Sequence, residues 1–116
     1  MPRRSADPLA LRTTDLFVLA VLGDGAQHGY ALAQAIDARS GGRVRIRPGD
    51  LYRVLYRMDA AGLIEMAPGG PPSASDARRT YYRITPLGRR TARDQAEMLS
   101  GICSAVLKRT PKAVRP

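Results

Sequence analysis

Arginine and tyrosine side chains gather on one arc of a predicted helix between Pro48 and Gly62, where they could bind nucleic acid. At about 100° per residue, the outer arc collects Gly49, Tyr52, Arg53, Tyr56 and Arg57, and the opposite arc is apolar. An arginine fork can bridge phosphates or guanine edges, and a tyrosine adds a hydroxyl donor. These properties are typical of a helix that reads a DNA groove. The alternative is a solvated face with two half-buried tyrosines.

The charge of the chain is strongly positive and unevenly distributed. The formal net charge is +9, with −1 on residues 1–38, +8 on residues 39–93 and +2 on residues 94–116. Such a field attracts polyanions, most commonly nucleic acid, with an anionic membrane surface as the alternative. We therefore expect double-stranded DNA as a partner of the middle of the chain.

Few side chains are suited to catalysis or to holding a metal. The chain has one histidine, His28, one cysteine, Cys103, and no closely spaced acidic cluster, whereas metal sites need several ligands at set spacings. No glycine-rich phosphate cradle of nucleotide enzymes is present either. We expect no enzyme, no metal site and no cofactor. His28 is expected to fix the start of the helix that follows it.

Cysteine content and hydropathy indicate in which cellular compartment the protein would be found. A lone cysteine excludes an internal disulfide and favours a reducing cytosol. The apolar run at residues 16–22 is far shorter than the roughly 20 residues that span a bilayer, and the N-terminus lacks a signal-peptide pattern. The sequence predicts a soluble, cytoplasmic protein without a membrane partner.

Glycine and proline positions divide the chain into elements. A first helix is expected to begin at a cap from Thr13, Thr14 or Asp15 and to stop at residues 23–25, although a strand over 16–22 remains possible. Further helices are expected at 29–39, 48–62 and 86–109. A strand or extended linker is expected at 43–47, and a hairpin of strands at 63–67 and 80–84. Tyr81 and Tyr82 alternate across the second strand, so one should face inward and the other outward or against the third helix. Residues 1–12 are interpreted as a flexible basic arm and residues 110–116 as a disordered tail.

This element order predicts a fold that is mainly α with a two-stranded β wing. Three helices, a hairpin and a long helix are the order of a winged helix-turn-helix domain. The DNA-binding domain would cover residues 13–85, with the third helix as recognition helix and the hairpin as wing. A C-terminal dimerisation helix would cover residues 86–109.

Four short strings in this order resemble the PadR-like family of bacterial transcriptional regulators. They are HGYAL at 28–32, PGDLY at 48–52, GLI at 62–64 and RRTYYRITPLGR at 78–89. The resemblance, to the type with a short, single C-terminal helix, implies a homodimeric winged-helix regulator, usually a repressor. It also implies that the third helix docks in the major groove, that the last helix dimerises, and that some members bind small molecules near the dimer interface.

Asp50 departs from the resembling motif, which usually carries a small or hydroxyl residue there. Its carboxylate favours the positive end of the helix but should repel nearby phosphates. Either Asp50 reads a cytosine amino group, or it lowers the affinity for DNA and the neighbouring arginines compensate. Of its possible roles we favour the structural one at the helix start. The expected DNA-binding residues are Arg47, Gly49, Asp50, Tyr52, Arg53, Tyr56, Arg57, Arg78 and Arg79.

The last predicted helix has an apolar surface broader than a small three-helix core can cover, which usually marks an interface. The expected dimerisation residues are Ala92, Ala96, Met98, Leu99, Ile102, Cys103 and Val106. A small-molecule effector would lie at the dimer interface, with Phe17, Met98 and Ile102 as candidate walls, although ordinary core packing is the default for each. The competing hypothesis for the whole chain is a winged-helix interaction module without specific DNA readout.

Overall fold

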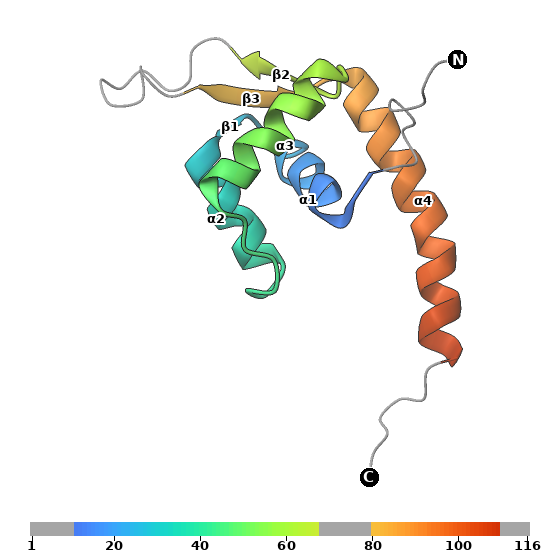
Figure 1. The fold of residues 1–116 in the computed structure, drawn as a ribbon. Coiled ribbons are helices and arrows are strands. Elements are labelled where there is room, and N and C mark those ends of the chain that lie inside the picture. The colour runs from blue at the N-terminus through green and yellow to red at the C-terminus, as the bar shows by residue number, and fades with distance from the viewer. Residues whose placement is uncertain (1–10, 68–79, 110–116) are drawn as a thin grey trace.

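Four helices and a small sheet make up the part of the chain that the structure describes, residues 11–67 and 80–109 of a computed structural model. The elements are α1 (Thr13–Leu22), β1 (Gln27–His28), α2 (Gly29–Arg39), α3 (Pro48–Ala60), β2 (Ile64–Ala67), β3 (Tyr81–Ile84) and α4 (Pro86–Arg109) (Figure 1). This is the expected winged helix-turn-helix fold with a long last helix. The predicted arm up to residue 10, the wing loop with Arg78 and Arg79, and the tail at 110–116 lie outside the described residues.

Glycines end α2 and α3 where the sequence predicts it. Gly62 has φ +80, and the Leu63 N–H donates to the Met58 carbonyl at 3.0 Å, which closes α3 in a Schellman turn. Gly41 has φ +67 and the Gly42 N–H donates to the Asp37 carbonyl at 2.8 Å, which closes α2 in the same way. The ends of the two helices that form the helix-turn-helix are therefore fixed by backbone geometry.

The described sheet has three strands, not the two that the sequence predicts. Its order is β1-β3-β2, with β3 antiparallel to both neighbours (Figure 1). Because β1 is only two residues long, it is too short to show the alternation of apolar and polar residues that predicts a strand. Neither of the two tyrosines of β3 faces solvent: Tyr81 and Tyr82 are both only 8% exposed, Tyr82 belongs to the core, and the Tyr81 ring meets the His28 ring edge-on at 5.3 Å.

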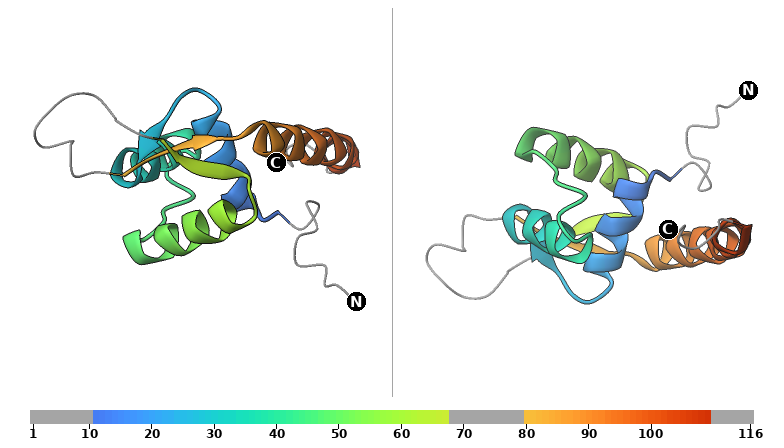
Figure 2. Two further views of the ribbon diagram at one scale, coloured as in Figure 1. Left: turned by 90° about the horizontal axis from the view of Figure 1, so that it is seen from above. Right: turned by 90° about the horizontal axis from the view of Figure 1, so that it is seen from below.

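The core lies between α1, α2, α3 and the sheet. Its fully buried side chains come mainly from α1 and from one face each of α2 and α3, including Val18, Leu19, Leu32, Ile36 and Leu55. The views from above and below keep α4 to one side of this body (Figure 2). The outer faces of α2 and α3 remain exposed to solvent.

The start of α4 is locked to the end of α3. The Thr85 hydroxyl donates to the Gly62 carbonyl at 2.6 Å and accepts the Gly88 N–H at 3.0 Å. A Cβ at Gly88 would lie 2.1 Å from the Leu63 carbonyl oxygen, so only glycine permits this crossing. The long helix therefore leaves the body in a direction fixed at its first turn.

Candidate nucleic-acid interface

The structure places the predicted outer arc of α3 on the surface. Leu51, Leu55 and Met58 are buried beneath it, as the amphipathic pattern predicts. On the other side, Tyr56 is 79% exposed and Tyr52 is 51% exposed. The helix thus presents aromatic hydroxyls and guanidinium groups to solvent along its length.

Tyr52 leans toward the start of α2 and does not stand free. A Cβ at Gly29 would lie 2.6 Å from the Tyr52 hydroxyl, so the missing side chain of Gly29 makes room for this ring. His28 accepts the Ala31 N–H at 3.3 Å and caps α2, which is the local role expected from the sequence. The start of α2 and the outer arc of α3 are therefore packed against each other.

Asp50 lies between two arginines at the first turn of α3. Arg53 Nη2 donates to Asp50 Oδ1 at 2.8 Å, and Arg47 Nε lies 3.7 Å from Asp50 Oδ2. All three side chains are at least half exposed. The two guanidinium groups offset the carboxylate, so this end of the helix keeps a net positive charge.

Arg57 differs from Arg53 because its guanidinium is anchored in the body of the protein. It donates to both oxygens of Asp15, at 2.8 and 3.3 Å, and the Asp15 side chain has no exposed surface. Asp15 also accepts the Arg12 N–H at 2.9 Å at the start of α1. The hydrogen bond from Arg57 to Asp15 raises the pKa of the guanidinium, against the opposing effect of its partial burial.

This ion pair could not be found from the sequence, because 42 residues separate its members. The sequence indicates Asp15 only as one of three capping candidates for α1, and this capping prediction is wrong because the N-cap is Arg12. Arg57 therefore has a structural role in fixing α3 to α1, although 45% of its side chain remains exposed.

The linker between α2 and α3 adds two arginines, Arg43 and Arg45, to the predicted set, which included only Arg47 from this segment. Residues 43–47 form no strand, and Val44 and Ile46 pack against the core while the three arginines are exposed. The alternation of arginine with apolar residues is visible in the sequence, but it predicts only a strand or a linker. In the structure it forms a basic ribbon, Arg43, Arg45 and Arg47, next to the first turn of α3.

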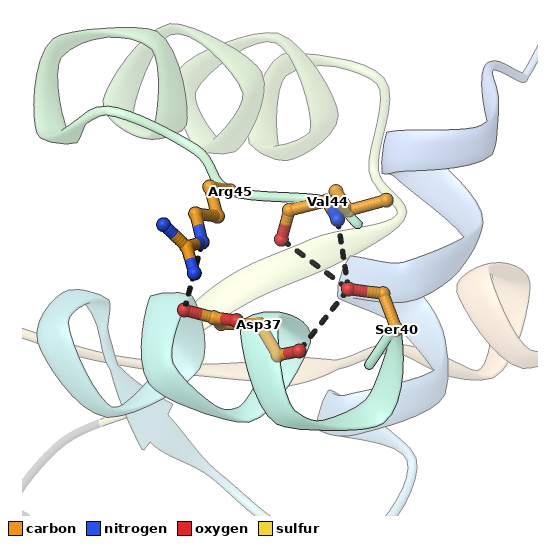
Figure 3. Close-up of polar contacts among 4 residues, drawn as sticks. All are labelled: Asp37, Ser40, Val44 and Arg45. Atoms are coloured by element: carbon orange, nitrogen blue, oxygen red, sulfur yellow. Dashed lines mark hydrogen bonds and ion pairs between the residues drawn. The ribbon is translucent and has the colours of Figure 1, made fainter. Parts of the chain in front are cut away.

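Ser40 holds this ribbon in place (Figure 3). Its hydroxyl accepts the Val44 N–H at 2.8 Å and donates to the Asp37 carbonyl at 3.1 Å, so the chain turns sharply after α2. Arg45 Nε lies 3.6 Å from Asp37 Oδ2, an exposed pair that solvent weakens. The ribbon is thus fixed at its backbone while its guanidinium groups remain available.

An open cleft of about 790 Å³ runs between the start of α1, the linker and α3. Its lining is dominated by charged and aromatic side chains, including Arg12, Arg45, Asp50, Arg53, Tyr56 and Arg57. A concave basic surface beside an exposed helix suits a polyanion better than an apolar ligand. Within residues 11–67 and 80–109, no group of His, Cys, Asp and Glu is arranged to hold a metal.

The residues predicted for dimerisation fall into two groups on α4. Ala92 is half-buried and packs against the core. Met98, Ile102 and Val106 are 44%, 58% and 56% exposed, and Ala96 and Cys103 are exposed as well, with Leu99 half-buried. In Figure 1 the second half of α4 runs away from the body.

None of the described helices is long and apolar enough to cross a membrane.

The three candidate effector walls do not lie together within the chain. Phe17 on α1 is half-buried and packs against the core, whereas Met98 and Ile102 lie on the projecting half of α4. A cavity of about 390 Å³ does lie between α1 and α4, but its lining includes Leu19, Ile84 and Ala92 and none of these three residues.

The chain matches a protein-family model and several known proteins. The model, described as "Transcriptional regulator PadR-like family", matches residues 18–94. An uncharacterized 37.1 kDa transposon protein of Streptomyces fradiae is 33% identical over 100 residues, which cover 84% of this chain and 27% of that protein. The chain thus spans about a quarter of that relative.

Two solved structures share the fold. A transcriptional regulator from Clostridium thermocellum has a TM-score of 0.70 and 27% identity, covering 84% of this chain and 92% of that one. A PadR-like transcriptional regulator from Bacillus cereus has a TM-score of 0.70 and 22% identity, covering 84% of this chain and 93% of that one.

Proposed function

The chain belongs to the PadR-like family of transcriptional regulators, and from this premise we propose that it is a homodimeric, sequence-specific DNA-binding repressor that acts in the cytoplasm and responds to a small molecule. The observation that carries the proposal is the continuous basic surface of α3 and the linker before it. Arg45, Arg47 and Arg53 are exposed there, and the carboxylates beside them are themselves about half exposed. The longer pairs, Arg45 with Asp37 and Arg47 with Asp50, are weak enough to exchange for phosphates.

We propose that α3 enters the major groove while the basic ribbon binds the adjacent phosphates. The N-terminal residues of a recognition helix contact base edges, and backbone contacts fix its register. Arg53 and Tyr56 face outward from α3 for this role, and Arg57 is held at the edge of the same surface by Asp15. Arg78 and Arg79, which precede β3 in the sequence, are proposed as further phosphate contacts.

The dimer is proposed from the exposed half of α4. Gly88, Thr91 and Gln95 are buried against the body, and Met98, Ile102 and Val106 continue the same helical face at spacings of three or four residues with their side chains exposed. On α1, Leu16 and Phe17 are only half-buried and Ala20 is exposed. An apolar face of this kind usually meets a partner, and a two-fold dimer would present two recognition helices to two half-sites.

The effector is proposed to bind where α4 of one protomer meets α1 of its partner, with Phe17, Met98 and Ile102 as walls. A ligand changes DNA affinity only by its differential affinity for two states, typically about 1–3 kcal/mol of coupling, so release of DNA is the relevant readout. Small aromatic and cationic compounds can be screened for displacement of bound duplex. A compound that still acts on Met98→Ala and Phe17→Ala proteins binds elsewhere.

The test of DNA binding uses the full-length chain and a duplex selected from a randomised pool, against a scrambled duplex of equal length. Removing one phosphate contact should reduce the slope of log affinity against log salt by about 0.9. Arg45→Ala should weaken both duplexes alike and reduce this slope, and Arg53→Ala should also relax sequence preference. The matched control is Arg93→Ala on α4, away from α3.

Equal affinity of the Arg45→Ala/Arg53→Ala double variant and the wild type would refute this interface. If the wild type prefers no duplex, the chain acts as a winged-helix interaction module without specific readout.

A further inference from the structure

An acidic side chain stands on the surface that is proposed to meet DNA, which is unexpected for a site that binds phosphates. The Asp50 side chain is 50% exposed and the Arg53 side chain 76% exposed, with the two joined at 2.8 Å. At Gly49, on the same turn, an added Cβ would meet nothing within 4 Å. This end of α3 is therefore open to a large ligand, and the carboxylate stands at the place where base edges would arrive.

The contact with Asp50 leaves Arg53 able to bind a base. A guanidinium carries five N–H donors, and Arg53 uses one terminal nitrogen, Nη2, toward the carboxylate. The remaining donors form a fork that matches the N7 and O6 acceptors of guanine in the major groove. A side chain restrained by such a contact has less rotamer freedom to lose on binding than a free arginine.

The Asp50 carboxylate also affects the affinity for DNA sites that lack guanine at the position facing Arg53. Wherever α3 approaches DNA, Asp50 repels the phosphates and so weakens the attraction that Arg53 and Arg47, 3.7 Å away on its other side, would otherwise exert. Where Arg53 meets a guanine, two charge-assisted hydrogen bonds oppose the repulsion. The Arg53–Asp50 pair therefore favours sites with guanine at that position and disfavours sites without it.

We propose that Asp50 is a positioning residue that holds Arg53 as a guanine reader and lowers the affinity of α3 for sites lacking that guanine. The inference rests on the proposed function. It differs from a purely structural role of Asp50 at the helix start, which would change stability and leave base preference intact. It also differs from direct reading of cytosine by the carboxylate.

The experiment measures the affinity of full-length protein for the selected duplex and for duplexes with each base pair replaced in turn. Asp50→Ala should reduce the preference for guanine at one position of each half-site about tenfold, while affinity for a scrambled duplex rises. Asp50→Asn, which keeps an acceptor oxygen for Arg53, should retain part of the preference. Arg53→Lys keeps the charge but lacks the fork, so it should lose the preference and bind the scrambled duplex as the wild type does.

Asp94→Asn on α4 is the matched control, because it removes one exposed carboxylate far from α3 and should leave base preference unchanged. Circular dichroism verifies that each variant folds, and Asp50→Ser supplies a second uncharged variant if alanine weakens the helix start. Unchanged guanine preference in folded Asp50→Ala and Asp50→Ser overturns the inference while leaving the proposed function intact. If the wild type prefers cytosine at one position and Asp50→Asn changes that preference to adenine, Asp50 reads the base directly and the inference is overturned. A wild type without any preferred duplex overturns both proposals.

Discussion

Replacing Arg57 with methionine should destabilise the fold far more than its half-exposed position suggests. The change removes hydrogen bonds of 2.8 and 3.3 Å from the Asp15 carboxylate, which has no exposed surface and keeps its bond from the Arg12 N–H. Breaking a buried ion pair by removing one partner costs about 3–5 kcal/mol. Because 45% of the Arg57 side chain is exposed, water can replace part of this interaction, and we expect a loss of about 2–3 kcal/mol.

Asp15→Asn should cost less, about 1–2 kcal/mol, because the amide still accepts the Arg12 N–H and Arg57 can turn into solvent. The double variant should be destabilised by at least about 1 kcal/mol less than the sum of the two single variants, since both changes remove the same interaction. Arg53→Met, the same chemical change at an exposed pair, serves as control and should cost less than about 1 kcal/mol.

Urea unfolding followed by circular dichroism measures these differences. With a denaturant slope of about 1.5 kcal/mol/M, a loss of about 3 kcal/mol lowers the midpoint by about 2 M. Protein concentration is held constant, because any coupling to dimerisation makes stability depend on it. An Arg57→Met protein that loses no more stability than Asp15→Asn, or two losses that add fully in the double variant, would refute the anchoring role of this pair.

Three further outcomes are expected. Gly88→Ala should lower thermal stability by at least about 2 kcal/mol, because its Cβ would strike a carbonyl oxygen, whereas Gly101→Ala on the same helix, with open space around it, should raise stability by about 0.5–1 kcal/mol. Burial, and then the nearby Tyr52 and Asp59, raise the pKa of Tyr82, so the folded state holds that proton more tightly and stability should fall as pH rises above about 10; a Tyr82→Phe protein should lack this part of the alkaline loss in urea titrations at each pH. Ile102→Asp should give monomers in light scattering, while Ser100→Asp, on the opposite side of the helix, should not; a wild type that is monomeric at tens of micromolar would contradict the dimer.

Much of the fold could be predicted because its signals are local. Pro48 and Gly62 bound α3 in the sequence and in the structure, and the bounds of α2 and α4 agree with the expected 29–39 and 86–109. These ends depend on backbone properties of single residues, which sequence shows directly. The strand β1 could not be predicted in this way, because it exists only through its pairing with β3.

The same distinction between local and long-range signals applies to the residues of the candidate site. Exposure of Tyr56 and Arg53 follows from helical periodicity, and the structure confirms their placement on the outer face. The anchoring of Arg57 by Asp15 depends on two helices meeting in space, and no pattern within either helix indicates it. Whether these residues contact DNA stays a prediction that the binding measurements decide.

The position of β3 in the centre of the sheet has a consequence for how the chain folds. β3 is the last strand of the described sheet in sequence order, yet both other strands bond only to it within that sheet. During synthesis α1, α2 and α3 emerge first, so β1 and β2 remain without their partner until residue 84 is available. Sheet formation therefore waits for a contact of long sequence separation, with β1 about 55 residues from β3, which slows folding relative to local helix formation.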